Sequence, residues 1–421
     1  MKKYKIVTLG CRTNQYESQA FLDQLLEQGY REVEKGEKAD LCIVNTCTVT
    51  ASADKRSLYQ IRKLSRDYSP SKLVVTGCLA ERSKKELLAL PEVTDVISND
   101  QKEELLPLIF PNEEWPEFSI KNFEAHTRAF VKIQDGCNSY CSYCIIPFVR
   151  GRSRSKKVID ILREIEGLVE NGYKEIVLTG INIGDFDGDQ DPPIRLCDLI
   201  RLVDKIEGLE RIRISSIDPD EVDDDLLDAV IKGEKTCPSM HIVLQSGSNL
   251  ILKRMRRKYT KQDFVDATIR LLKANPSFTF TTDLIVGFPG ETEEEFEETL
   301  QLIREIGFVK VHMFPYSDRP KTRASRMPNK VPLEVIQRRK GELLELAEKQ
   351  AFALREKYIG KELSVLLEGE EKPGFLMGRT DNFLPVYVPK RNLRSNVTIK
   401  VKILDNNPEG LIGEHQAGRK I

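Results

Sequence analysis

The amino-acid sequence predicts an α/β protein built from three units: a parallel α/β domain over residues 1–115, a partial TIM-like (β/α) barrel over 123–353 and a small β-barrel over 356–421. Two observations predict this class. Short β-rich segments alternate with helical segments through most of the chain, which is the pattern of a parallel sheet. Beyond Gly360 short strands are separated by glycine, proline and asparagine, which is typical of a small barrel. A length of 421 residues is also too great for one core.

Composition narrows the class of protein further. The formal net charge is -1, so a surface that binds nucleic acid has to be a local one. The first apolar run is too short for a secretory signal, and no run reaches the roughly 18 apolar residues that span a bilayer. Nine cysteines in such a chain argue against a disulfide framework and for reduced thiols, some of them metal ligands. We therefore expect a soluble, cytoplasmic protein that does not associate with a membrane.

In the first unit three β-rich segments each end at a cysteine. Helical stretches at Glu17–Gly29 and Ala51–Ser65 separate them, so the strands should run parallel. The carboxyl ends of parallel strands share one edge of the sheet, where ligands bind, and the cysteines should converge there. This arrangement indicates a metal cluster, with three buried small hydrophobic side chains as the alternative. The segments and cysteines are Tyr4–Gly10 with Cys11, Asp40–Thr46 with Cys47, and Lys72–Gly77 with Cys78.

Three further cysteines, Cys42, Cys197 and Cys237, show no ligand pattern. Cys42 lies inside its strand and should pack in the core, while Cys197 and Cys237 receive no role. A linker follows the first unit, and the single tryptophan, Trp115, is expected to pack there. The linker is marked by Pro107, Pro111 and Pro116.

The second unit reads as six strand–helix repeats, which predict an open or partial barrel with its site at the carboxyl ends of the strands. The expected strands are Phe130–Ile133, Glu175–Leu178, Arg211–Ile214, His241–Leu244, Thr279–Ile285 and Val309–Phe314. The expected helices are Val158–Asn171, Leu196–Ile206, Asp224–Lys232, Lys261–Lys273 and Glu293–Ile306.

A second cysteine triplet follows the first strand of this barrel. Cys137, Cys141 and Cys144 form a C-x3-C-x2-C pattern, with Tyr143 just before the third cysteine. Soft thiolates suit iron, and three of them hold an iron–sulfur cube by three corners, leaving one iron open for a substrate or cofactor. A structural zinc site is the alternative, but zinc wants four ligands and no fourth is evident nearby. Tyr143 could stack on an adenine or simply pack.

Four loops at the expected strand ends carry glycine, serine and glutamine, and together they favour a nucleotide-like cofactor. Glycine permits close approach of a ligand, and neutral polar side chains can bind ribose or carboxylate oxygens. The loops are Leu178–Gly184, Ser215–Pro219, Gln245–Asn249 and Leu284–Glu291. Within and beside them, the expected cofactor contacts are Tyr143, Thr179, Gly180, Asn182, Ser216, Gln245, Asp283 and Gly287.

The last unit begins after a long charged helix, Leu333–Tyr358. Its expected strands are Glu362–Glu368, Leu376–Arg379, Leu384–Val388 and Val397–Leu404. Basic residues lie near Phe383 and Tyr387, and small β-barrels with basic and aromatic surfaces commonly bind RNA. These basic residues are Lys390, Arg391, Arg394, Lys400 and Lys402. Three further basic runs, Arg150–Lys157, Arg254–Lys258 and Arg319–Arg326, could contact phosphates or form solvated faces.

The two cysteine triplets and the order of the three units resemble the methylthiotransferases of the radical S-adenosylmethionine (SAM) superfamily. In that family an N-terminal cluster domain precedes a radical SAM core and a C-terminal TRAM β-barrel. The resemblance covers essentially the whole chain. It implies a [4Fe-4S] cluster on Cys137, Cys141 and Cys144 that binds SAM and generates a 5′-deoxyadenosyl radical. It also implies an auxiliary [4Fe-4S] cluster, carrying the sulfur, on Cys11, Cys47 and Cys78.

Within this family the segments Cys11–Ser18 and Phe314–Arg319 are most similar to the branch that acts on N6-threonylcarbamoyladenosine beside the tRNA anticodon. The resemblance therefore implies the tRNA anticodon stem-loop as partner, with an electron donor such as flavodoxin or ferredoxin and a sulfur source. N6-isopentenyladenosine of tRNA and an aspartate of a ribosomal protein are the alternative substrates. A threonylcarbamoyl group carries a carboxylate, for which Arg150, Arg319 and Arg323 are candidate cations. An iron–sulfur RNA-binding protein without activity is the non-enzymatic alternative.

Overall fold

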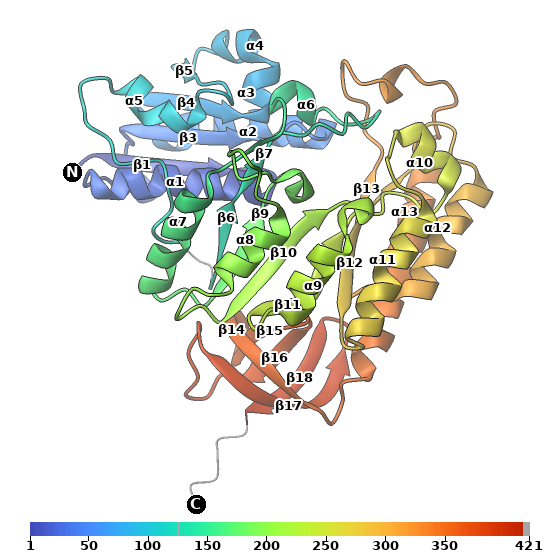
Figure 1. The fold of residues 1–421 in the computed structure, drawn as a ribbon. Coiled ribbons are helices and arrows are strands. Elements are labelled where there is room, and N and C mark those ends of the chain that lie inside the picture. The colour runs from blue at the N-terminus through green and yellow to red at the C-terminus, as the bar shows by residue number, and fades with distance from the viewer. Residues whose placement is uncertain (124–126, 416–421) are drawn as a thin grey trace, which may run out of the picture.

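The computed structural model describes residues 1–123 and 127–415, and it arranges them in the three predicted units (Figure 1). The N-terminal unit lies at one end of the central barrel and the small C-terminal barrel lies at the other. Residues 124–126, near the predicted start of the second unit, and 416–421, the predicted end of the third, lie outside the described residues. No helix in the described ranges combines the length and apolar character needed to cross a membrane.

The N-terminal unit is a five-stranded parallel sheet in the order β2-β1-β3-β4-β5. Its central strand β3 is buried along its whole length, as expected for a sheet with both faces covered. The strands are β1 Lys3–Thr8, β2 Arg31–Glu32, β3 Leu41–Thr46, β4 Lys72–Gly77 and β5 Asp95–Val96. The helices are α1 Arg12–Glu27, α2 Ala51–Tyr68, α3 Cys78–Arg82, α4 Lys84–Leu88 and α5 Leu105–Ile109.

The central unit is an open six-stranded parallel sheet in the order β13-β12-β11-β10-β9-β6, which confirms the predicted partial barrel. Its helices pack on the outer face (Figure 1). The strands are β6 Arg128–Lys132, β9 Glu175–Thr179, β10 Arg211–Ile217, β11 Thr236–Ile242, β12 Thr279–Val286 and β13 Lys310–Pro315. The outer helices are α7 Val158–Glu170, α8 Leu196–Val203, α9 Asp224–Lys232, α11 Lys261–Ala274 and α12 Glu293–Ile306.

Shorter elements decorate the carboxyl ends of these strands. They are the two-stranded ribbon β7 Gln134–Asp135 and β8 Arg154–Ser155, and the helices α6 Ile146–Val149 and α10 Asn249–Met255. The sequence prediction for β11 was wrong at both ends, because the strand starts at Thr236 and ends at Ile242. Pro238 inside the strand explains the error, since proline normally argues against a strand interior.

The C-terminal unit is a closed barrel in the order β14-β15-β16-β18-β17, preceded by the helix α13 Leu333–Glu356. Its strands are β14 Glu362–Lys372, β15 Phe375–Thr380, β16 Pro385–Pro389, β17 Thr398–Asn407 and β18 Gly410–His415. The sequence prediction missed β18, which the barrel needs in order to close. Closure pairs β18 with both β16 and β17, so no edge strand is left exposed.

The C-terminal barrel covers the amino ends of the central strands. Arg213 donates to the backbone carbonyls of Thr380 and Asp381 at 2.8 Å, and Arg211 donates to the carbonyl of Arg379 at 3.0 Å. Phe383, which the sequence placed on an RNA-binding surface, instead turns inward. Its ring centroid lies 5.1 Å from the Arg213 guanidinium and 4.5 Å from that of Arg379. The opposite, carboxyl ends of the strands therefore remain for the site.

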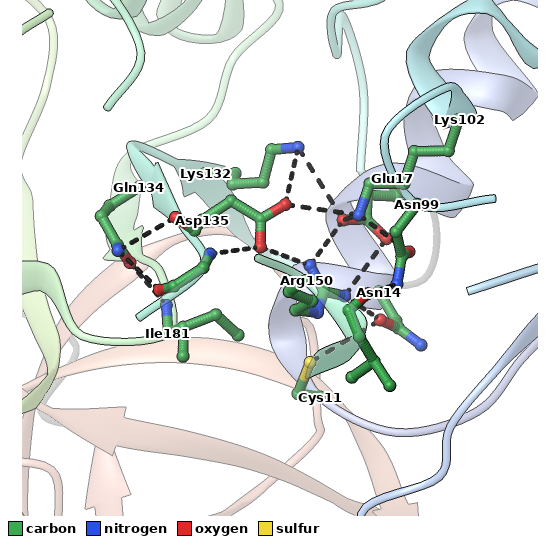
Figure 2. A network of polar contacts seen from close by, with 12 residues as sticks. Cys11, Asn14, Glu17, Asn99, Lys102, Lys132, Gln134, Asp135, Arg150 and Ile181 are labelled. Carbon is green, nitrogen blue, oxygen red and sulfur yellow. Dashed lines mark hydrogen bonds and ion pairs between the residues drawn. The ribbon is translucent and has the colours of Figure 1, made fainter. Parts of the chain in front are cut away.

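A buried ionic network joins the N-terminal unit to the central barrel (Figure 2). The Arg150 guanidinium donates to Glu17 Oε1 at 3.0 Å and to Asp135 Oδ1 at 2.7 Å. The Lys102 ammonium pairs with the same two carboxylates, and Lys132 Nζ lies 3.8 Å from Glu17 Oε1. Glu17 and Lys102 come from the N-terminal unit, whereas Asp135 and Arg150 come from the central one. The side chains are almost completely buried.

The charges of this network hold the carboxylates ionised. Burial alone would raise the pKa of Glu17, but Arg150 and Lys102 outweigh it and lower that pKa from 4.5 to about 2. Burial also acts on Asp135, where Arg150 and Lys102 again prevail and hold the pKa well below its usual range. Because buried charges are costly unless paired, each of these groups depends on the others.

Gly77 shapes the edge of the N-terminal sheet just before Cys78. Its φ of +91° is one that side chains rarely adopt. A Cβ atom there would lie 2.4 Å from the carbonyl oxygen of Thr46 and 2.6 Å from its nitrogen. The close approach of β4 to β3 at this point therefore requires glycine.

We expect Glu17→Gln to lower the free energy of unfolding by about 3–5 kcal/mol, because it leaves Arg150 and Lys102 with one buried carboxylate instead of two. Chemical denaturation of the cluster-free protein measures this loss. Glu342→Gln is the matched control, since its pair with Arg338 is exposed and should change stability by less than about 1 kcal/mol.

The same pair of proteins gives a pH test. Since the folded-state pKa of Glu17 is depressed, its contribution is present above pH 4.5 and is lost as the pH falls towards about 2. The stability difference between wild type and Glu17→Gln should therefore shrink over that interval. A difference that stays constant down to pH 2 would contradict the ionised network.

We expect Gly77→Ala to destabilise the protein by more than about 2 kcal/mol, through backbone strain and overlap with Thr46. Gly167→Ala is the control, because Gly167 lies within α7, a Cβ atom there would meet no atom within 4 Å, and alanine favours helix by about 0.5–1 kcal/mol. Denaturation midpoints should move in opposite directions; equal midpoints for the two variants would refute this role of Gly77.

Candidate functional site

The loop that carries Cys137, Cys141 and Cys144 lies between β7 and α6, at the carboxyl ends of the barrel strands. Ser142 anchors it, because its backbone nitrogen donates to the carbonyl of Met255 at 2.8 Å and its carbonyl accepts from Ala324 at 2.8 Å. The three thiols are half-buried and interact electrostatically with one another. Burial, reinforced by Cys141, raises the pKa of Cys144 to about 12.

Arg257 belongs to this cysteine loop, a role that the sequence did not reveal. Its Nη1 donates to Cys141 Sγ at 3.0 Å, its Nη2 pairs with Asp218, and the guanidinium lies 4.6 Å from the Tyr259 ring centroid. Within the run Arg254–Lys258, this residue is thus committed to the loop instead of to phosphate contact. No local pattern marks it, since Cys141 and Asp218, the two residues to which the guanidinium donates, are distant in sequence.

Cys11, Cys47 and Cys78 follow the carboxyl ends of the adjacent parallel strands β1, β3 and β4. The structure brings them together: the Cys47 and Cys78 thiols each interact electrostatically with Cys11. Burial is the main cause that raises the pKa of Cys47 to about 11, and it also raises the pKa of Cys78. Asn14 supports this edge by donating to the carbonyl of Thr46 at 3.1 Å.

The two triplets are neighbours. Cys78 packs in one apolar group with Ile145 and Val149, and Ile145 directly follows Cys144. The buried Arg150 directly follows Val149 in the chain, and it interacts electrostatically with Cys78 and Cys11. The ionic network of Figure 2, which includes Asn14 beside Cys11, therefore lies next to the N-terminal cysteine group.

The donor set at both positions fits iron–sulfur clusters. Thiols with raised pKa values lose their protons on binding a metal, whose positive charge offsets the cost of burial. Within the described residues, no three His, Cys, Asp or Glu side chains converge tightly enough to hold a single metal ion. A cube spreads its ligands more widely than one ion does, and three thiols leave one of its corners open.

The polar residues expected to contact a cofactor fall into two groups. The first lies where β9 and β10 end. Thr179 is buried at the end of β9, Ser216 is half-buried near the end of β10, and Asn182 donates to Glu221 Oε1 at 2.8 Å.

The loop after β9 is held by the Gln134 side chain. The backbone nitrogens of Ile181 and Asn182 are not free, because both donate to Gln134 Oε1 at 2.9–3.0 Å. Gly180 sits against the same side chain, since a Cβ atom there would lie 2.8 Å from its Oε1. These two backbone nitrogens are therefore committed to Gln134 of β7.

The second group lies at the ends of β11 and β12. Gln245, with φ +67°, bridges the two strands through its backbone. Gly287 has φ +78° and donates to Glu291 Oε2 at 2.7 Å. The Tyr143 ring meets the Phe288 ring edge to face, with centroids 6.4 Å apart, so it packs in the apolar group beside the cysteine loop.

Asp283 stands apart from these loops, inside the barrel. A cavity of about 540 Å³ lies there, lined from the strands by residues that include His241 and His312 and from the N-terminal unit by Arg12. Asp283 Oδ1 lies 3.5 Å from His241 Nε2, and Asp283 interacts electrostatically with Arg12. Burial and the neighbouring Arg128 lower the pKa of Arg12 to about 10. Sequence reasoning missed Arg12, although a cation directly after a cluster cysteine was a visible signal.

Known families match all three units. The description "Uncharacterized protein family UPF0004" matches residues 3–99, "Radical SAM superfamily" matches 131–303 and "TRAM domain" matches 356–415. Among solved structures, the radical S-adenosylmethionine methyltransferase TsrM from Kitasatospora setae, with cobalamin and a [4Fe-4S] cluster bound, gives a TM-score of 0.56 at 13% identity. That match covers 94% of this chain and 84% of TsrM, and it supports the fold.

Curated relatives match over nearly their whole length. The threonylcarbamoyladenosine tRNA methylthiotransferase MtaB of Chlamydia pneumoniae is 47% identical over 98% of this chain and 97% of its own. A tRNA-2-methylthio-N(6)-dimethylallyladenosine synthase of Desulfitobacterium hafniense is 35% identical over 99% of this chain and 98% of its own. Identity at this level over full-length chains shows that this chain belongs to the radical SAM tRNA methylthiotransferase family.

Proposed function

We propose that this protein converts N6-threonylcarbamoyladenosine beside the tRNA anticodon to its 2-methylthio derivative. The observation that carries the proposal is the presence of two adjacent thiol triplets at the same end of one barrel. Sulfur insertion at an unreactive carbon needs both a radical generator and a sulfur donor, so two neighbouring open clusters suit it. The 47% identity to a relative named for this substrate supports the choice of substrate.

In this proposal Cys137, Cys141 and Cys144 hold a [4Fe-4S] cluster that binds SAM. When bound, that pair supplies a 5′-deoxyadenosyl radical able to remove hydrogen from carbon. The chain's own contribution is to hold the loop rigid through Ser142 and to place the Arg257 cation against Cys141. A positive charge there stabilises thiolate ligation.

We assign the SAM contacts to residues that line the carboxyl ends of the strands. Their side chains offer neutral hydrogen bonds, and the glycines permit close backbone approach. Asp283 fits this group least directly, since it faces Arg12 and His241 inside the barrel. The assigned residues are Tyr143, Thr179, Gly180, Asn182, Ser216, Gln245, Asp283 and Gly287.

Cys11, Cys47 and Cys78 hold the second [4Fe-4S] cluster, which carries the sulfur to be transferred. The edge that presents them is rigid because Gly77 lets β4 approach β3 closely and Asn14 bonds the β3 carbonyl. The buried Arg150 contributes positive charge beside these thiols. That charge favours thiolates over thiols and so favours loading of the cluster.

The partners follow from the same function. The tRNA anticodon stem-loop is the substrate, and the C-terminal barrel carries the exposed cations Lys390, Arg391, Arg394, Lys400 and Lys402 for its backbone. An electron donor such as flavodoxin or ferredoxin and a sulfur source complete the reaction in the cytoplasm. We take the working units as residues 1–115, 123–353 and 356–421.

The two clusters can be tested separately by iron counting after anaerobic reconstitution. We expect about eight iron atoms in the wild type and about four in each variant that replaces one cysteine triplet with alanine. The variant lacking Cys137, Cys141 and Cys144 should not cleave SAM. The variant lacking Cys11, Cys47 and Cys78 should still form 5′-deoxyadenosine but no methylthio product.

Cys197→Ala is the control for these variants, because Cys197 is buried in α8 away from both triplets and its loss should leave the iron content unchanged. Full iron content in either triplet variant would contradict the assignment of ligands.

The substrate can be tested by mass spectrometry of tRNA nucleosides from a host that lacks this activity. Expression of the chain should convert N6-threonylcarbamoyladenosine to its 2-methylthio derivative, and the triplet variants should not. Appearance of methylthiolated N6-isopentenyladenosine instead would show that the chain acts on the alternative substrate. A methylthiolated ribosomal-protein aspartate, with unchanged tRNA, would remove tRNA from the proposal.

A further inference from the structure

Arg12 combines two features: it lies beside a cysteine of the N-terminal triplet and it lines the cavity inside the barrel. It directly follows Cys11, and its side chain lines the 540 Å³ cavity inside the barrel together with His241, His312 and residues of the C-terminal barrel. Its guanidinium lies 5.4 Å from the centroid of the Phe130 ring. Within residues 1–123 and 127–415 it makes no hydrogen bond and no ion pair. Its donors are therefore available to a molecule in the cavity.

The charges around Arg12 are mostly unfavourable to it. Arg128, Arg213 and Arg379 repel it, and Asp283 is the principal attraction. Each of these three arginines forms an ion pair with a carboxylate: Arg213 pairs with Glu175, and Arg128 and Arg379 pair with Glu368. Among the residues that line the cavity, six are cationic and three, Glu348, Glu371 and Glu409, are carboxylates, so the lining carries a surplus of positive charge that would attract an anion.

Helix stability does not explain this arginine. Arg12 is the first residue of α1, where the positive end of the helix dipole disfavours a cation, and the first turn holds no acidic residue. The preference of a first helical turn for acidic over basic residues is thus broken beside Cys11. Sequences that fold well break such rules chiefly at functional sites.

The arginines that the sequence suggested for a substrate carboxylate are not placed like Arg12. Arg150 is buried in ion pairs with Glu17 and Asp135. Arg319 is buried and donates to Asp54 Oδ2 at 2.7 Å and to the carbonyl of Thr48 at 3.2 Å. Arg323 is exposed on the surface loop after β13 and does not line the cavity.

Resting on the proposed function, we propose that Arg12 binds the carboxylate of the threonylcarbamoyl group and so sets the choice of substrate. A guanidinium fork matches a carboxylate with two parallel hydrogen bonds. The location fits as well, since carbon 2 and the N6 group belong to the same six-membered ring. If a cluster held by Cys11, Cys47 and Cys78 supplied the sulfur to carbon 2, the N6 substituent would lie near Arg12, the residue that follows Cys11. An isopentenyl group offers nothing to an unpaired guanidinium.

The test uses the anaerobically reconstituted full-length protein and two anticodon stem-loops. One carries N6-threonylcarbamoyladenosine, and the other carries its methyl ester, which keeps the size but removes the charge. We expect wild type to prefer the acid by at least about tenfold in kcat/KM, because charge-assisted hydrogen bonds are lost with the ester. Arg12→Gln should bring this ratio close to one, and Arg12→Lys should restore part of it.

Arg163→Gln is the control, because it removes an exposed arginine on the outer helix α7 and should leave the ratio unchanged. Iron content and SAM cleavage without RNA are measured for every variant, so that an effect on the cluster is seen separately. A ratio in Arg12→Gln equal to that of wild type overturns the proposal. The proposal is also overturned if Arg12→Gln lowers kcat/KM by the same factor for both stem-loops, since Arg12 would then support only the cluster.

The wild type separates this proposal from the proposed function. If wild type methylthiolates neither stem-loop, the assigned substrate is wrong. If it acts on both equally, the substrate stands and the proposal for Arg12 falls. Should Arg12→Gln lose its clusters, the ratio measured with Arg12→Lys decides, because that variant keeps the charge but lacks the fork: a ratio as high as that of wild type counts against the proposal.

Discussion

The buried pairing of Arg150 with Glu17 and Asp135 is the interaction on which the rest of the structure depends. It joins two units whose cysteines would otherwise have no fixed separation. Lys102 and Lys132 belong to the same network, and the Arg150 guanidinium interacts electrostatically with Cys11 and Cys78. A thiolate-held cluster carries negative charge, so the network that fixes the geometry also prepares the site electrostatically.

The central barrel encloses a cavity between the C-terminal barrel and the cysteine triplets. Its base is covered by the C-terminal barrel, whose Phe383 lies beneath Arg213 and Arg379, and the cysteine triplets stand at the strands' carboxyl ends. The interior is lined by arginine and histidine side chains as well as by aliphatic ones such as Val177, Ile214 and Leu344. An anionic group entering it would be attracted by the cationic side chains.

Much of this could be predicted from the sequence, because the informative patterns were local. Each of the three predicted N-terminal strands leads into a cysteine, so the parallel sheet implied that the three cysteines converge at one edge. The missed features depend on contacts between distant residues. Arg150 meets Glu17 across 133 positions and Arg257 meets Cys141 across 116, so the sequence revealed neither partner, and Arg150 was instead considered for a substrate carboxylate. β18 lacked a strong strand pattern, and only closure of the barrel requires it.

The central claim is that two iron–sulfur clusters lie side by side and act on one substrate. Electron paramagnetic resonance of the reconstituted protein with both clusters reduced tests it most directly, because neighbouring paramagnets broaden or split each other's signals. We expect an interaction spectrum in wild type that neither single-cluster variant shows. A wild-type spectrum equal to the sum of the two variants' spectra would mean that the clusters do not share one site, and would contradict the account.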